Sequence, residues 1–107
     1  DDEPTVYITG YTVYYKGIAD VSDKFSIDLI LAFAGAAKTR GPFELTMSVR
    51  DLLETAQTFA NAKIMPVHFE GWAHFTQGLD EINGAFEAFG LSDRLFIVNR
   101  GETRTFI

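Results

Sequence analysis

The sequence predicts an α/β fold: a mostly parallel sheet of four to five strands with three helices on one face. Short apolar runs alternate with segments whose apolar residues recur every three or four positions, in the order β-α-β-α-β-α-β. The runs are apolar at nearly every position, as expected for strands that are buried on both faces. A chain of 107 residues has the length of one small domain, residues 1–107.

The first half of the chain contains two predicted strands and one predicted helix. Residues 5–9 (TVYIT) combine β-branched and aromatic residues before a glycine, which is typical of a strand. Ile18, Val21 and Phe25 recur at helical spacing, so a short amphipathic helix is expected there. Residues 26–35 (SIDLILAFAG) are apolar at almost every position and predict the clearest strand.

The second half predicts two further helices. Ser48, followed by Asp51 three residues later, is typical of a helix N-terminus. Gly90 is a plausible C-cap for the last helix. The first of these helices has the apolar stripe Val49, Leu52, Leu53, Ala56 and Phe59 or Ala60; the second, over 78–89, has Leu79, Ile82, Phe86 and Phe89. Strands are expected over 62–67 and 94–98, and residues 102–107 can add a short last one.

The helices are expected to cover only one face of the sheet. Sequential right-handed crossovers place all of them on the same side. In the strand 26–35, however, Leu29, Leu31 and Phe33 alternate with Ile30 and Ala32, so both of its faces are apolar. A second copy of the chain is the expected cover for the other face, in an isologous homodimer or a higher homo-oligomer.

Composition excludes several classes of function. The net charge is −6 and no run of Lys or Arg occurs, so nucleic acid and anionic membranes are not expected partners. The absence of cysteine excludes disulfides and thiolate metal sites. No apolar run approaches membrane-spanning length and no basic-then-apolar leader opens the chain, so a cytoplasmic location is expected. A small-molecule ligand stays open.

The segment MPVHFEGWAHF, residues 65–75, holds both histidines of the chain. His68, Glu70 and His74 are candidate ligands for zinc or manganese, because a hydrolytic zinc site needs about three protein ligands and an open position. Their spacing is not the helical His-Glu-x-x-His arrangement, and nothing in the sequence fixes them on one face. The alternative is a histidine that is hydrogen-bonded at a strand end, with no resident cofactor.

Four segments resemble the C-terminal half of metallo-β-lactamase-fold hydrolases, in the UlaG-like, L-ascorbate-6-phosphate-lactonase-type branch. They are PTVYITGYTVYYKGI, FAGAAKTRGPFELTMS, MPVHFEGWAHFTQG and FGLSDRLFIV, in the family's order. The resemblance implies half of an αββα sandwich, with a metal pair at the sheet edge where the halves meet. It aligns His68 with a metal-binding histidine and Tyr11 with the position of a bridging aspartate. It also implies that Trp72, His74 and Phe75 line the approach to the site.

Two departures from the family pattern count against catalysis. The His-x-His-x-Asp-His motif is absent, and Tyr11 replaces the bridging carboxylate. We therefore expect a non-catalytic half of a hydrolase, stabilised by homodimerisation and without catalytic residues, with a pocket formed by Tyr11, Glu70, Trp72, His74 and Phe75. The alternative is a metal-dependent hydrolase of lactones or phosphoesters whose site is completed by a second chain, with His68 as a ligand. A truncated or recombined gene product is the third interpretation.

Overall fold

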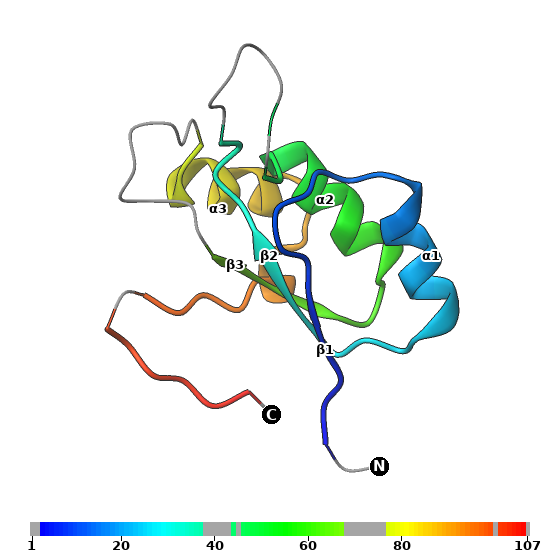
Figure 1. Ribbon diagram of the computed structural model, residues 1–107. Helices are drawn as coiled ribbons and strands as arrows, with labels where there is room; N and C mark the ends of the chain where they lie inside the picture. The colour runs from blue at the N-terminus through cyan, green and yellow to red at the C-terminus, as the bar shows by residue number, and fades with distance from the viewer. Residues whose placement is uncertain (1–2, 38–43, 45, 68–76, 100, 107) are drawn as a thin grey trace.

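The computed structural model describes residues 3–37, 44, 46–67, 77–99 and 101–106, in which strands and helices alternate along the chain (Figure 1). All strand pairs are parallel, in the sheet order β1-β2-β3. The elements are β1 (Val6–Ile8), α1 (Lys16–Lys24), β2 (Leu29–Phe33), α2 (Val49–Thr58), β3 (Lys63–Val67), α3 (Leu79–Ala88) and a 3-10 turn, η1 (Ser92–Arg94). The predicted α/β class, with three helices and a parallel sheet, is confirmed.

The helix ends follow the capping signals of the sequence. Ser48 Oγ accepts a hydrogen bond from the Asp51 N–H, and the Asp51 carboxylate accepts one from the Ser48 N–H, both at 3.1 Å. Gly90 has a φ of +70° and ends α3, as predicted. Phe25 and Phe89 do not complete the apolar stripes as predicted, because each follows the last turn of its helix; they are 59% and 61% exposed.

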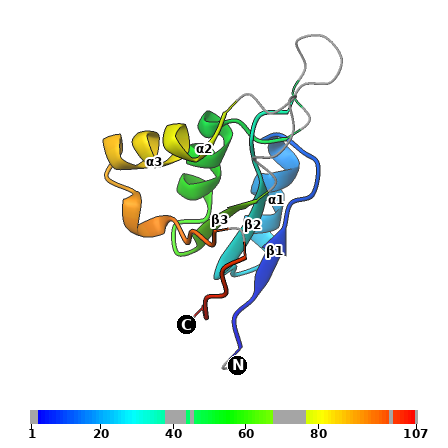
Figure 2. The ribbon, with the colours of Figure 1, turned by 90° about the vertical axis from the view of Figure 1, so that its left-hand side faces the viewer.

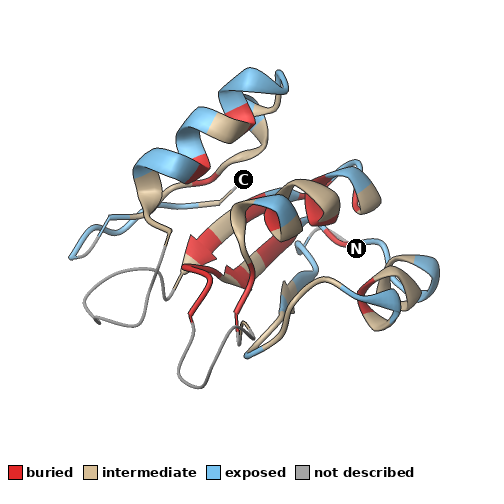
Figure 3. Cartoon of the chain, turned by 90° about the horizontal axis from the view of Figure 1, so that it is seen from above, coloured by how far each residue is buried: buried red, intermediate tan, exposed pale blue. Residues whose placement is uncertain are grey.

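The hydrophobic core lies between the helices and one face of the sheet. Ile30 of β2 and Ile64 of β3 are in register and fully buried. Figure 2 shows α2 and α3 on the same side of the sheet, and Figure 3 shows that the outer sides of these helices are exposed. All three helices contribute residues to the core cluster around these strand residues, including Ile18, Leu52, Ala56, Ile82 and Phe86.

The opposite face of the sheet is also apolar, and we call it the open sheet face. Among the described residues, no helix covers it. Of its apolar residues, those of β1 are the most exposed, with Val6 at 45% and Ile8 at 61%, whereas Leu29 of β2 is 7% exposed. The strand register assigns to this face the rows Val6, Leu29 and Lys63; Ile8, Leu31 and Met65; and Phe33 and Val67.

The predicted strand over 94–98 is reduced to a single bridge, so the described sheet has three strands in place of four to five. Leu95 bridges Ile64, and the Phe96 N–H donates to the Ile64 carbonyl at 2.8 Å. In a parallel ladder, the next bond on this side of β3 has to come from the N–H of residue 66. Residue 66 is proline and has no N–H, so the pairing stops. Residues 102–106 form no strand either.

The chain after Leu95 covers the side of the open sheet face next to β3. Phe96 is 8% exposed, because the ring of Phe106 meets it edge-on at 5.5 Å and the Arg104 guanidinium lies 4.5 Å from its ring centre. Arg104 also donates to the Ile97 carbonyl at 2.6 Å. This cover does not extend to β1, where Ile8 stays 61% exposed.

Arg94 joins η1 to the C-terminal end of α2. Its guanidinium donates to the carbonyls of Ala56 at 2.9 Å, Phe59 at 2.6 Å and Ala62 at 2.6 Å. Burial lowers the pKa of Arg94, and the neighbouring Asp93 opposes this effect. An arginine nevertheless remains charged at neutral pH, so Arg94 acts as a cationic C-cap of α2.

Candidate functional site

The carboxyl ends of β1, β2 and β3 meet at one edge of the sheet, because the three strands are parallel. Open α/β sheets bind ligands at this edge. Tyr11 lies three residues after the end of β1, and the loop that begins at Ala34 follows β2. His68 is the residue that follows β3 in the sequence. The topology therefore places Tyr11, the predicted site residue that is described, after the strand end at this edge.

Hydrogen bonds hold the strand ends of this edge together. Thr9 Oγ1 accepts from the Phe33 N–H at 3.1 Å and joins the end of β1 to β2. The Ala34 N–H donates to the Val67 carbonyl at 2.8 Å and joins the ends of β2 and β3. Because Val67 immediately precedes residues 68–76, the start of that segment is anchored on the end of β2.

Gln77 anchors the other end of the same segment. Its N–H donates to the Gly35 carbonyl at 3.1 Å, and its Oε1 accepts from the Val49 N–H at 2.7 Å, at the first turn of α2. Val67 and Gln77 are thus bound to the consecutive residues Ala34 and Gly35. The described residues on either side of 68–76 are therefore both hydrogen-bonded to this loop.

Thr46 gives the loop after β2 its shape. The side chain is buried, donates to the Ala34 carbonyl at 2.8 Å and accepts from the Ala37 N–H at 2.9 Å. Ala36 has a φ of +47°, a left-handed conformation that is uncommon for a residue with a Cβ. Because the hydroxyl of Thr46 already donates one hydrogen bond and accepts another, we interpret it as a structural group rather than a ligand.

Tyr11 is the predicted site residue that the described structure contains. It is 69% exposed, and its ring meets that of Phe33, a residue of the open sheet face, edge-on at 5.6 Å. His68, Glu70, Trp72, His74 and Phe75 lie outside the described residues. Their grouping with Tyr11 into a pocket, and the role of His68 as a ligand, stay predictions.

The described part of the edge does not by itself fit a metal centre. Within residues 3–37, 44, 46–67, 77–99 and 101–106, no group of three or more His, Cys, Asp or Glu side chains is placed to hold a metal ion. We therefore derive no catalytic step from these residues.

None of the described helices is long and apolar enough to cross a membrane.

The sequence prediction missed three residues that build the edge and its support. Thr46, Gln77 and Arg94 all act through contacts with residues at least nine positions away along the chain. Helical and strand periodicity carry no information on such partners. The sequence did contain one signal that the strand over 94–98 would not pair fully. Pro66 lies within the apolar run of the neighbouring strand, and a proline there indicates an edge with incomplete pairing.

The fold is similar to part of two solved structures of hydrolase-like proteins. Two solved structures superpose on 98% of the chain: an isothiocyanate hydrolase from Delia radicum gut bacteria, with a TM-score of 0.90 and 28% identity, and a possible metal-dependent hydrolase from Veillonella parvula, with a TM-score of 0.89 and 24% identity. The second comparison, at its lower identity, supports the fold alone. In both cases the chain covers 40% of the other protein.

A curated relative also matches the chain over part of its own length. The UPF0173 protein YddR of Bacillus subtilis is 28% identical to this chain over 104 residues, which are 97% of the chain and 41% of the relative. No protein-family model matches the chain. The chain thus spans about two-fifths of the proteins that it matches, and the predicted resemblance to one portion of a metallo-hydrolase is confirmed.

Proposed function

We propose that this chain is one sheet-and-helix half of a metal-dependent hydrolase, and that its site is completed by residues outside the chain. The observation that carries the proposal is the open sheet face, which is apolar and which no helix of the described residues covers. The similar structures are about two and a half times as long, so each contains chain with no counterpart here. Part of that additional length is available to cover the equivalent face.

In this proposal, His68 is the metal ligand that the chain contributes. It follows Val67 in the sequence, and the Val67 carbonyl is bound to the Ala34 N–H at the edge. The remaining ligands have to come from the polypeptide that covers the open sheet face. A zinc or manganese ion at such a site would supply an activated water for hydrolysis. Membership of the UlaG-like branch, a lactone or phosphoester substrate and a cytoplasmic location belong to the proposal and rest on the sequence alone.

A chimera tests this function. The chain replaces the matching 41% of the Bacillus subtilis relative, and the purified chimera is analysed for zinc and manganese by elemental analysis. We expect stoichiometric metal and its loss in His68→Ala, while His74→Ala, at the other candidate histidine, shows whether that loss is specific to position 68. A folded chimera without metal even after zinc or manganese is added, or a His68→Ala variant with unchanged metal, would contradict the proposal.

The second candidate function is a non-catalytic protein that buries the open sheet face against a second copy of itself. Tyr11 favours it, because a tyrosine stands at the edge where the resemblance expects a bridging carboxylate. Burial of apolar surface contributes about 25 cal/mol per Å², so a dimer formed through this face would gain stability. Residues such as Val6 and Ile8, at 45% and 61% exposed, would then be buried.

Size-exclusion chromatography with light scattering separates the two candidates. A homodimer has twice the 11.9 kDa of the chain, and Ile8→Asp should convert it to a monomer, because a carboxylate would be buried in the interface. A wild-type chain that is monomeric at low micromolar concentration would contradict the homodimer. It would not affect the metal content of the chimera, so the two experiments are independent.

A further inference from the structure

The strand β1 has a hydrogen-bonding edge that no described strand uses. It is an outer strand in the order β1-β2-β3, and Figure 2 shows no further strand beyond it. Thr5 and Thr9 are bound to β2, through the carbonyl of Thr5 at 3.3 Å and the N–H of Thr9 at 3.1 Å. Because the backbone groups of successive residues point to opposite sides of a strand, the N–H and C=O groups of Val6 and Ile8 point away from β2.

The other edge of the sheet, along β3, cannot take up a strand in the same way. The Ile64 carbonyl on that side already accepts from the Phe96 N–H at 2.8 Å. Pro66 is the next residue that faces outward, and it has no N–H to donate. In the part of the chain that the structure describes, the sheet can therefore be extended next to β1 and not next to β3.

The free edge of β1 is short, and the backbone sets its limits. Pro4 is the outward-facing residue before Val6, and it has no N–H. Gly10 is the outward-facing residue after Ile8, and its φ of +66° lies outside the strand region. The edge thus offers the N–H and C=O groups of Val6 and Ile8, which suit a short extended segment.

The side chains of β1 favour the same kind of partner. The ring of Tyr7 packs against the ring of Phe59 with their centroids 5.9 Å apart, so β1 is fixed on the helix side of the sheet. On the open sheet face, Val6 and Ile8 are 45% and 61% exposed. A neighbouring strand would place its own side chains about 5 Å from these two, so it would cover them and also pair their backbone groups.

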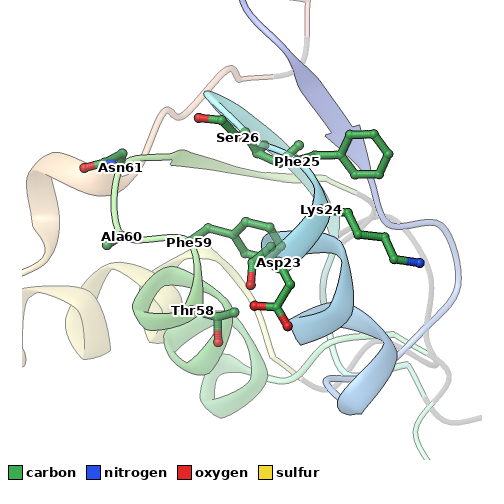
Figure 4. A pocket seen from close by; sticks show the side chains of 10 residues that line it. Asp23, Lys24, Phe25, Ser26, Thr58, Phe59, Ala60 and Asn61 are labelled. Atoms are coloured by element: carbon green, nitrogen blue, oxygen red, sulfur yellow. The ribbon is translucent and has the colours of Figure 1, made fainter.

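The pocket in Figure 4 does not involve this edge. It has a volume of about 440 Å³ and is lined by residues 22–27 and 58–61, at the ends of α1 and α2 and in the connections that follow them. None of its lining residues belongs to β1. The pocket and the free edge are therefore separate features of the surface.

We propose that the polypeptide that completes the hydrolase adds a strand to this sheet along the free edge of β1. The inference rests on the proposed function, which requires such a polypeptide, and it states how that polypeptide binds. The similar structures contain the additional length, since this chain covers 40% of each. An extended segment exchanges main-chain hydrogen bonds with Val6 and Ile8, which is the way exposed sheet edges bind peptides. The rest of the polypeptide covers the open sheet face.

Amide hydrogen exchange, followed by NMR, tests the added strand. The isolated ¹⁵N-labelled chain is compared with the chimera of the Bacillus subtilis relative. In the isolated chain, the amides of Tyr7 and Thr9 face β2 and should exchange slowly, whereas those of Val6 and Ile8 should exchange roughly tenfold faster or more. In the chimera, all of these amides should exchange slowly.

Two results of this comparison would overturn the proposal. Fast exchange at Val6 and Ile8 in a folded chimera would show that no strand is added. Slow exchange at both positions in the isolated chain would show that a second copy already pairs with the edge. The metal content of the chimera reports on the proposed function separately. A chimera that holds metal while both amides exchange fast contradicts the added strand alone, and a chimera without metal in which both are protected supports it.

A proline at position 8 tests the hydrogen bonds themselves. Ile8→Pro removes an N–H that points away from β2, and Ile8→Ala is the matched control that shortens the side chain and keeps the N–H. The difference in Tm between the two variants should be about 2–4 °C larger in the chimera than in the isolated chain, because the N–H is paired only in the chimera. An equal difference in both proteins would contradict pairing at this edge.

Discussion

Replacement of Arg94 by alanine should cost more stability than any other exchange of a surface charge in the described structure. Arg94 makes three hydrogen bonds of 2.6–2.9 Å, to the carbonyls of Ala56, Phe59 and Ala62. A hydrogen bond to a charged group contributes about 1.5–3 kcal/mol, but water can reach carbonyls beside a half-buried side chain after truncation. We therefore expect a total loss of about 2–3 kcal/mol, the equivalent of one to two such bonds.

The assay for this prediction is urea and thermal unfolding followed by circular dichroism. For a domain of this size, a loss of 2–3 kcal/mol corresponds to a decrease in Tm on the order of 10–20 °C. Arg104→Ala is the matched control, since it removes the same charge and a cation–π contact with Phe96; it should cost about 1 kcal/mol or less. An Arg94→Ala variant no less stable than Arg104→Ala would refute the assignment of Arg94 as the cap of α2.

Three further predictions follow from buried or capping groups. Thr46→Val should lower the free energy of unfolding by about 1–3 kcal/mol in urea titrations, because the Ala34 carbonyl and the Ala37 N–H lose their shared partner; Thr46→Ser should retain most of the stability. Ser48→Ala should cost about 1 kcal/mol by the same measurement, through loss of the N-cap of α2. Burial, and secondarily Tyr15, raises the pKa of Tyr7 above its ordinary value of 10.0. The folded state therefore binds the phenol proton of Tyr7 more tightly than the unfolded state does. The free energy of unfolding should not depend on Tyr7 below pH 10 and should fall as the pH rises above it. Tyr7→Phe should remove that alkaline decline, and an unchanged pH profile in this variant would contradict the prediction.

The elements with local signals could be predicted from the sequence. The capping pair Ser48 and Asp51 lies within one helical turn, so its meaning is contained in a few residues, and α2 begins at the expected position. The apolar run that became β2 was equally clear, because nearly every residue faces either the core or the open sheet face. The parallel order of the strands was also predicted, and it brings their carboxyl ends to one edge of the sheet.

The features that failed depend on partners distant in the sequence. The run at 94–98 has strand composition, but its pairing is limited by Pro66, on a strand about thirty residues earlier. Phe25 and Phe89 fit the helical spacing, yet each lies one residue beyond the helix end and turns to solvent. The site itself stays a prediction, because five of its residues lie outside the described structure and the ligand set of a metal centre depends on which polypeptide completes the edge.

Thiol labelling at the open sheet face tests the central claim most directly, namely that this face is an interface. The chain has no cysteine, so Ile8→Cys and Phe89→Cys each introduce a single thiol at positions that are both 61% exposed. Labelling rates are compared at low micromolar protein and at about a hundredfold higher concentration, where mass action favours association. We predict that the thiol at position 8 becomes protected at the higher concentration, while the thiol at position 89 reacts at the same rate throughout. Equal and constant rates at both positions would show that the sheet face does not bind a second copy of the chain, which contradicts self-association through this face.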